Sequence, residues 1–304
     1  MTTVSVIIPT YNRLAFLREA VASVVAQTFD DWELIVADDG STDGTRAYLS
    51  ELREPRVRVV ELEHSGNPAR VRNAAIAAAC GRWLAFLDSD DAWLPAKLEV
   101  QLARLAAAST CGWSCTGIQF VDQGGATIIQ PAGPPYRPRS GWILEALITL
   151  EATTTTPTLM VLRSLFHQVG GFDETFLHRE DRDLSLRLAA ASELCALAEP
   201  LTLVRHHANR WTSAQRVAEL HRYNELAYRK TFASAANRSV RALCTQQCAT
   251  ERIAMARVLS REGEFVAAMR SIAGAIRDDP LAPRVWRAMA GVVARAAVPS
   301  AGRS

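Results

Sequence analysis

The sequence GRWLAFLDSDD, residues 81–91, contains a buried strand that ends at a cluster of carboxylates. Its five apolar residues, Trp83 to Leu87, lie between a glycine and the tetrad of residues 88–91, as expected of a strand inside a sheet. Three like charges within four residues repel one another unless a cation lies among them. Mg²⁺ and Mn²⁺ prefer such oxygen ligands and usually retain waters and substrate phosphates. The alternative is a solvated Asp-rich turn or a helix N-cap.

Short apolar strands alternate with amphipathic helices through the first half of the chain. We expect strands at 4–8, 33–37, 57–62 and 83–87, separated by helices at about 14–25, 43–52 and 69–79. This alternation predicts an α/β fold with a Rossmann-like, mainly parallel sheet flanked by helices.

Polar, turn-forming segments follow three of these strands. They are residues 9–12 (PTYN), 38–41 (DDGS) and 88–91 (DSDD). In parallel sheets, ligands bind beyond the carboxyl ends of the strands. We therefore expect the three segments to converge on one ligand-binding edge.

Length and composition favour one catalytic domain with an appendage. The chain has 304 residues and a hydrophobic fraction of 49%, enough for a substantial core, against about 100–200 residues for a typical domain. No apolar run reaches the roughly 18–20 residues of a membrane span, and the first residues lead directly into a strand. Six cysteines show no secreted disulfide framework. We therefore expect a cytoplasmic protein, with peripheral attachment to the inner membrane face as a second possibility.

The two parts of the chain differ in charge. Residues 214–304 contain 15 Arg or Lys and 7 Asp or Glu, a formal charge of +8, whereas residues 1–213 carry −6. The basic part is predicted to be all helical, with helices at about 214–230, 239–260, 263–277 and 282–297. Its last helix combines apolar residues with arginines, which fits either docking on neighbouring helices or a second subunit, or contact with an anionic bilayer.

Six motifs, in this order and spacing, resemble those of the family 2 glycosyltransferases of the GT-A fold. They are SVIIPTYNR (5–13), DDGSTDGT (38–45), ARVRNAAI (69–76), FLDSDD (86–91), GGFDE (170–174) and EDRDL (180–184). The resemblance covers roughly residues 3–213. It implies a catalytic domain over 1–213, followed by an all-α extension over 214–304.

The resemblance also implies a nucleotide pocket. Asp39 would accept the ring N–H of a uracil- or thymine-type base, and Asp38 would help to shape that pocket. Alternatively, the two aspartates only begin an Asx-turn before Gly40. Arg72 matches the family's Arg-Asn pair near the nucleotide, with Arg70 as a competitor. The remaining nucleotide-binding residues expected are Pro9, Thr10, Tyr11, Asn12, Asp88 and Ser89.

The metal would be Mn²⁺ or Mg²⁺. Asp88 and Asp90 would face the ribose and the ion, and Asp91 is a possible second ligand. His207 matches the family's Arg-x-His histidine and could complete the metal shell or contact the diphosphate. His206 is a weaker candidate, and the alternative for both is that they are plain surface histidines. The ion would bridge the two phosphates and stabilise the charge left when the sugar departs.

Asp181 is the residue that the resemblance assigns as general base. It follows a Gly-Gly-Phe turn and begins an amphipathic stretch, so the alternative is that the acidic residues only cap a helix. Attack in line with sugar departure would invert the anomeric centre. The predicted function is transfer of a sugar from a UDP- or dTDP-type donor to a hydroxyl of a glycan, polysaccharide or lipid-linked acceptor. Nucleic acid is not an expected partner, and self-association through the C-terminal helices is a further possibility.

Other interpretations remain open. A nucleotidyltransferase would need a basic loop that grips a triphosphate, and a non-catalytic sugar-nucleotide-binding protein would lack the base. A purely helical scaffold fits only 214–304. The CxxxC pairs at 111–115 and 244–248 are read as ordinary thiols, since zinc sites use tighter spacings. The turn-rich residues 122–140 are either a lid near the acceptor or an insertion without a role.

Overall fold

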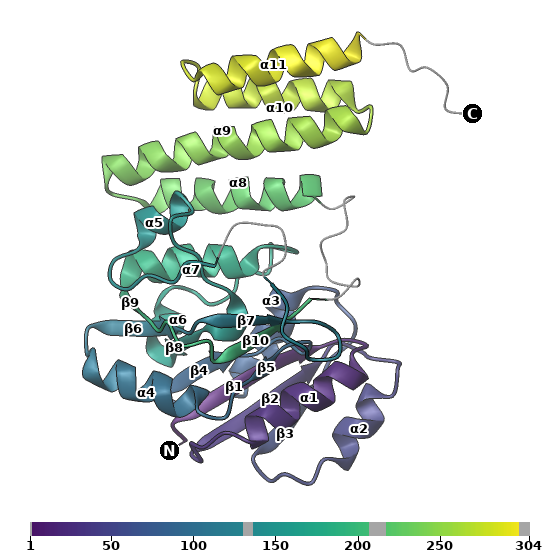
Figure 1. The fold of residues 1–304 in the computed structure, drawn as a ribbon, viewed down its shortest axis with the longest axis vertical. Coiled ribbons are helices and arrows are strands. Elements are labelled where there is room, and N and C mark those ends of the chain that lie inside the picture. The colour runs from purple at the N-terminus through teal and green to yellow at the C-terminus, as the bar shows by residue number, and fades with distance from the viewer. Residues whose placement is uncertain (1, 130–135, 207–216, 298–304) are drawn as a thin grey trace. The chain divides into compact units, whose positions relative to one another are not determined.

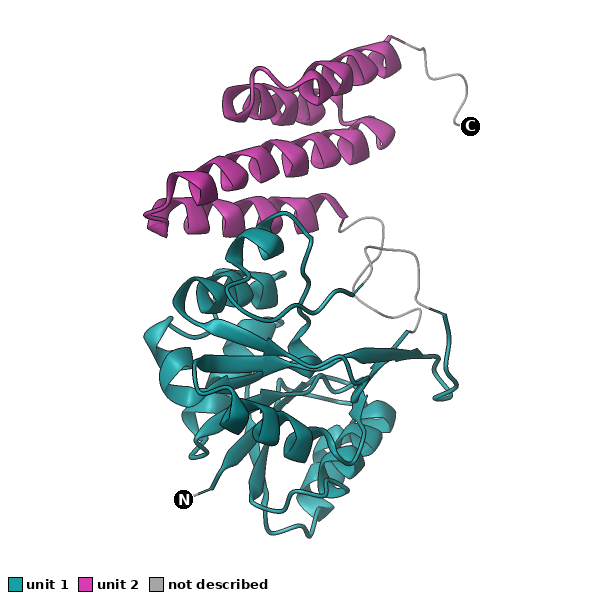
Figure 2. Ribbon diagram, turned by 60° about the vertical axis from the view of Figure 1, so that its left-hand side comes forward, with its two compact units in different colours: residues 1–209 teal, residues 210–304 magenta. Residues whose placement is uncertain are grey.

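A computed structural model describes residues 2–129, 136–206 and 217–297 (Figure 1). The chain divides into two compact units, residues 1–209 and residues 210–304 (Figure 2). The domain boundary expected at 213/214 lies outside the described residues.

The first unit is built on a seven-stranded sheet with the order β3-β2-β1-β4-β8-β6-β9. The strands are β1 (Val4–Thr10), β2 (Trp32–Asp38), β3 (Val57–Glu61), β4 (Trp83–Phe86), β6 (Cys111–Cys115), β8 (Met160–Leu162) and β9 (Glu193–Ala196). Only β8 runs against the others, so the mainly parallel sheet is confirmed. The four strands expected from the sequence are present, with ends shifted by at most two residues.

A second sheet, of three strands, was not predicted. It has the order β5-β10-β7 and consists of β5 (Ala92–Trp93), β7 (Ile118–Val121) and β10 (Thr202–Arg205). Because β5 directly follows the tetrad, its antiparallel pairing with β10 brings the end of the first unit beside the carboxylates. The strands are short and far apart in sequence, so no local pattern indicates their pairing.

Helices cover both faces of the main sheet. They are α1 (Leu14–Val25), α2 (Thr45–Glu51), α3 (Pro68–Ala77), α4 (Lys97–Ala107), α5 (Leu144–Ile148), α6 (Arg163–Gln168) and α7 (Glu180–Ala191), with a 3₁₀ turn at Thr156–Thr158. Alternate residues of β1 and β2, including Val6 and Val36, share one core with Leu17 of α1 and Leu98 of α4. The opposite face holds an aromatic cluster of Phe86, Phe166 and Phe172.

The second unit is all helical, as predicted. It contains α8 (Val217–Ser234), α9 (Arg238–Arg261), α10 (Phe265–Asp278) and α11 (Pro283–Ala296) (Figure 1). Helices α9, α10 and α11 share an apolar core that includes Ile253, Ile272 and Val285. No helix in the described part of the chain is both long and apolar enough to cross a membrane.

Candidate active site

The carboxyl ends of three parallel strands bring the polar segments together at one edge of the sheet. Thr10 lies opposite Asp38 in the β1–β2 register, and the Leu87 N–H just beyond β4 donates to the Ile7 carbonyl of β1. The convergence expected from the sequence is therefore present. It places residues 9–12, 38–41 and 88–91 around the same edge.

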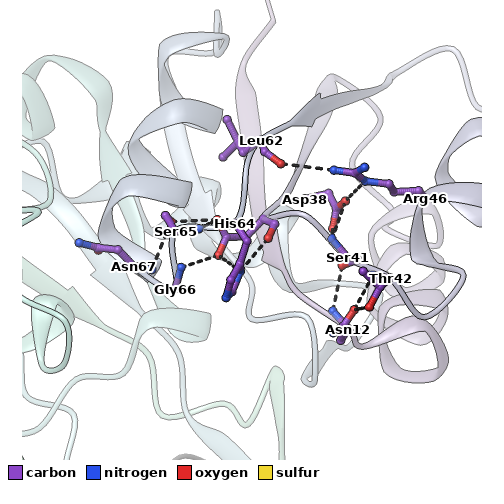
Figure 3. Close-up of polar contacts among 11 residues, drawn as sticks. Asn12, Asp38, Ser41, Thr42, Arg46, Leu62, His64, Ser65, Gly66 and Asn67 are labelled. Atoms are coloured by element: carbon purple, nitrogen blue, oxygen red, sulfur yellow. Dashed lines mark hydrogen bonds and ion pairs between the residues drawn. The ribbon is translucent and has the colours of Figure 1, made fainter.

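Asp39 is buried and holds the loop at residues 64–66 (Figure 3). One carboxylate oxygen accepts from the Ser65 N–H and hydroxyl, both at 2.9 Å, and the other accepts from the Gly66 N–H at 2.9 Å. Gly40 allows this approach, because its φ is +80° and a Cβ there would lie 2.9 Å from the His64 nitrogen. Asp39 was expected to face a base. What the structure shows is that it anchors the loop at residues 64–66.

Asp38 forms a separate cluster beside Asp39 (Figure 3). Its carboxylate is fully buried, accepts from the Ser41 N–H at 3.2 Å and pairs with Arg46 at 3.0 Å. The Ser41 hydroxyl accepts from the Asn12 N–H at 2.9 Å, and the Asn12 side chain accepts from the Thr42 N–H at 2.7 Å. The residues expected to shape the pocket thus fix one another, and both the Asx-turn interpretation and the pocket interpretation fit Asp38.

An aromatic pair lies beside this network. The rings of Tyr11 and His64 are stacked with centroids 4.0 Å apart and an interplanar angle of 18°, and both side chains are nearly half exposed. Pro9 is partly buried, whereas Thr10 is buried and its hydroxyl has no hydrogen-bond partner among the described residues. The solvent-facing Tyr11 ring is suited to contact a planar ligand.

Arg72 connects the tetrad to the start of α7. Its Nη2 donates to Asp88 at 2.7 Å and its Nη1 donates to Glu180 at 2.6 Å, although these carboxylates come from elements far apart in sequence. The guanidinium is buried and also lies over the Phe172 ring, 5.4 Å from the centroid. Arg70, the competitor for this position, is exposed on the same helix. Arg72 therefore lies between two carboxylates.

Burial and charge shift the ionisation of this group of residues. Burial raises the pKa of Glu180, the Arg72 charge opposes that rise, and the nearby Asp181 adds to it. Burial likewise raises the pKa of Asp88, against the Arg72 charge and together with the repulsion of Asp90. The two carboxylates thus depend on the shared guanidinium to remain ionised.

Asp181 lies in the first turn of α7, next to Glu180. The helix begins after Arg179, whose φ of +64° turns the chain into it. Asp183, two residues on, points elsewhere: it is buried and forms an ion pair with Arg187 at 2.5 Å. The two aspartates of this motif therefore have different surroundings, and Asp181 is the more exposed.

The segment before α7 is held by Asn73, the residue after Arg72. Its side-chain amide donates to the Phe172 carbonyl and to the Glu174 carboxylate, both at 2.9 Å. Arg72 thus contacts the start of α7 at Glu180, and Asn73 holds the preceding segment at Phe172 and Glu174. The sequence indicated the Arg-Asn pair but not these contacts.

Arg205 is the functional-site residue whose role the sequence did not reveal. Its backbone N–H donates to the Asp91 carboxylate at 2.8 Å, and its guanidinium donates to the Asp90 carbonyl at 3.1 Å and the Gln123 carbonyl at 2.8 Å. It also pairs with Glu19 of α1. Arg205 therefore holds the tetrad against α1 and the turn that follows β7.

The tetrad residues differ in accessibility. Ser89 and Asp91 are buried, whereas Asp88 and Asp90 are partly exposed. His207, the expected histidine ligand, lies outside the described residues, and His206 is exposed. Among the residues that the structure describes, no group of three or more His, Cys, Asp or Glu is arranged to hold a metal ion. One or two carboxylates suffice for Mg²⁺ when substrate phosphates and water complete its shell, so Asp88 and Asp90 fit such an ion.

Comparison with known proteins identifies the family. Residues 5–138, which contain the β1, β2 and β4 edge, match the model described as glycosyl transferase family 2. These residues belong to this family. The match includes the segments 9–12, 38–41 and 88–91 and ends before Asp181.

Two bacterial relatives are similar to part of this chain. The putative teichuronic acid biosynthesis glycosyltransferase TuaG of Bacillus subtilis is 43% identical over 127 residues, which cover 41% of this chain and 50% of TuaG. The UDP-Glc:alpha-D-GlcNAc-diphosphoundecaprenol beta-1,3-glucosyltransferase WfgD of Escherichia coli is 41% identical over 102 residues, 34% of this chain and 40% of WfgD. The chain thus matches half or less of the length of these relatives.

Solved structures share the GT-A fold with this chain. Residues 1–349 of S. aureus TarS, in complex with UDP-GlcNAc, align with a TM-score of 0.71 and 20% identity, covering 97% of this chain and 89% of that one. The mannosyltransferase PcManGT of Pyrobaculum calidifontis, in complex with GDP-Man and Mn²⁺, aligns with a TM-score of 0.61 and 18% identity, covering 96% and 79%.

Proposed function

We propose that the chain is an inverting, metal-dependent glycosyltransferase that moves a sugar from a UDP- or dTDP-type donor to a hydroxyl of a glycan, polysaccharide or lipid-linked acceptor. The observation that carries the proposal is the Arg72 bridge between Asp88 and Glu180. It ties the carboxylates expected to face the donor to the Glu180–Asp181 pair expected to face the acceptor. A domain built only to bind a nucleotide has no need of this second carboxylate pair.

On the donor side, Asp39 and the exposed Tyr11 ring provide a hydrogen-bond acceptor and an aromatic surface for a base. The uridine-type donor is supported by WfgD, whose name specifies UDP-Glc, and by the UDP-GlcNAc in the TarS structure. PcManGT, which holds GDP-Man, shows that the fold also accepts another base.

We assign Asp88 and Asp90 to an Mn²⁺ or Mg²⁺ ion, which would neutralise the leaving diphosphate. Asp91 is less suited to this role than the sequence indicated, because it is buried and already accepts the Arg205 N–H. The Mn²⁺ in the PcManGT structure supports the choice of a divalent ion.

On the acceptor side, Asp181 would accept the proton of the attacking hydroxyl as the sugar leaves. It lies in the first turn of α7, next to Glu180, and is more exposed than Asp183. Because an alcohol is a far weaker acid than a carboxylic acid, proton transfer and bond formation must proceed together. Attack opposite the departing diphosphate inverts the anomeric carbon.

Release of nucleoside diphosphate from a panel of sugar nucleotides, with and without glycan acceptors, tests this proposal. Asp181→Asn keeps the shape of the side chain but cannot accept a proton, so transfer should fall by roughly 10²–10⁴-fold while donor binding survives. Asp183→Asn is the comparison. It weakens the buried pair with Arg187, so it should lower stability by about 1.5–3 kcal/mol but leave transfer by the folded protein nearly unchanged. If Asp183→Asn abolished sugar transfer and Asp181→Asn did not, the assignment of Asp181 as the general base would be wrong.

A nucleotidyltransferase or a non-catalytic binding protein would give other results. The first would not release nucleoside diphosphate from sugar nucleotides, but would release pyrophosphate when given a nucleoside triphosphate and a sugar phosphate. The second would bind the sugar nucleotide without releasing diphosphate, even with every acceptor.

A further inference from the structure

The hairpin formed by α10 and α11, residues 265–296, has an unusual exposed surface. Every exposed residue in it is apolar, glycine, proline or arginine. The large apolar side chains include Leu281, Val266, Val293 and Trp286, which are 90%, 69%, 52% and 46% exposed. A surface helix of a globular protein normally has charged and polar residues of several kinds on its outer face. The preceding helix, α9, follows that norm, with Gln246 and Thr250 exposed.

The charge of this surface is entirely positive. Four exposed arginines, Arg270, Arg277, Arg287 and Arg295, have no ion pair or hydrogen bond among the described residues. The only acidic residues of the hairpin are Asp278 and Asp279, and both are engaged: the first with Arg229 at 3.0 Å and the second with Arg284 at 2.7 Å. The exposed arginines are therefore not neutralised within the hairpin.

The exposed face of α11 carries an apolar stripe with an arginine beside it. Trp286, Ala290 and Val293 are exposed at helical spacing, and Arg287 lies next to this stripe. Arg295 is also exposed, but the helical turn puts it about 180° around the axis from Trp286, at the far edge of the exposed face. The other side, with Val285 and Val292, packs into the apolar core of the second unit. The exposed stripe is thus not needed for folding of that unit.

We propose that the exposed surface of the α10–α11 hairpin binds an anionic lipid bilayer. Arginines attract anionic headgroups, while neighbouring Trp, Leu and Val side chains insert into the boundary between headgroups and acyl chains. A second copy of the same surface would bring uncompensated arginines together, and nucleic acid would leave Leu281 and Val293 in water. No described helix can span the membrane, so the contact is peripheral. The proposal goes beyond the transfer reaction and does not depend on it.

Vesicle flotation with the full chain tests the proposal. The protein should float with vesicles of equimolar phosphatidylcholine and phosphatidylglycerol, not with phosphatidylcholine alone, and added salt should weaken the binding. Arg287→Gln with Arg295→Gln should reduce the vesicle partition coefficient roughly 30-fold, since each arginine near the surface contributes about fivefold. The matched control is Arg238→Gln with Arg257→Gln. It removes the same charge from exposed positions of α9 and should bind like the wild type.

A second variant separates insertion from simple attraction between charges. Leu281→Ser with Val293→Ser leaves the charge unchanged. It removes two apolar side chains that would be buried in the bilayer, so it should weaken vesicle binding tenfold or more. Unchanged binding of this variant, or an equal loss in the α9 control, would overturn the proposal. The proposal would also be overturned if the protein formed a dimer that the same substitutions dissociate, or if it bound duplex DNA as tightly as it binds the vesicles. Such results would leave the proposed function intact, because diphosphate release is measured without vesicles.

Discussion

Arg72→Met is the substitution that tests the site most directly. It keeps a long apolar side chain over Phe172 but removes both guanidinium donors. Asp88 and Glu180 then face each other without a cation, and their side chains are only 29% and 10% exposed. Removing one partner of a buried ion pair costs about 3–5 kcal/mol. Because Asp88 retains some contact with solvent, we expect a loss of about 3 kcal/mol in the free energy of unfolding of the first unit.

A double-mutant cycle shows whether the loss comes from the bridge. Glu180→Gln removes one of the two carboxylates left without a cation, so the combined variant should be more stable than the sum of the single effects predicts, by about 1–3 kcal/mol. Urea unfolding of the four proteins measures this coupling. Arg70→Met, on the exposed side of the same helix, is the control and should change stability by less than about 0.5 kcal/mol.

The same variants report on function. If Arg72 positions the two carboxylate pairs, transfer by folded Arg72→Met should fall by about 10²-fold or more, because small displacements of reacting groups are costly. Stability equal to that of the wild type, or strictly additive effects in the cycle, would refute the bridge.

Three other perturbations have defined outcomes. Asp90→Ala should lower turnover by orders of magnitude without unfolding the protein, and wild-type activity should vanish with EDTA and return with Mn²⁺ or Mg²⁺; full activity in EDTA would refute the metal assignment. Asp39→Ala should weaken UDP or dTDP binding by roughly 10–150-fold in calorimetry, through the lost base contact and the freed 64–66 loop. Burial opposes the ionisation of Glu33, but hydrogen bonds from Ser5 and Cys80 and the Arg58 charge lower its pKa from 4.5 to about 2. The ionised Glu33 therefore contributes about 3 kcal/mol to the free energy of unfolding above about pH 4.5, and this contribution is lost as the pH falls towards 2. Glu33→Gln should accordingly be less stable than the wild type at pH 7 and equally stable in acid.

The edge of the main sheet could be predicted because its signals are local. Apolar runs of strand length mark β1, β2 and β4, and each is followed by a polar turn. Parallel strands then necessarily bring those turns together. The same reasoning gave the four helices of the second unit, where apolar residues repeat at helical spacing.

The contacts that organise the site could not be predicted in the same way. The pairing of β5 with β10 and the bonds of Arg205 to Asp91 and Gln123 join segments that are distant in sequence. Each bond depends on how the chain packs. The Arg-x-His resemblance marks the position of Arg205 but does not indicate its partners. For Arg72 the motif predicted a position near the nucleotide. Its two carboxylate partners became evident only in the structure.

The aspartates of the site resemble one another in sequence but differ in what they bind. Asp38, Asp39 and Asp91 are buried and accept backbone N–H groups, which fix the position of each carboxylate. Asp88 instead pairs with the side chain of Arg72 and remains partly exposed. A carboxylate fixed by backbone amides is suited to shape a pocket, whereas a partly exposed one can still approach an ion or a phosphate. Partial exposure is therefore the physical reason to propose the metal at Asp88 and Asp90. Asp91 instead holds β10 beside them through the Arg205 N–H.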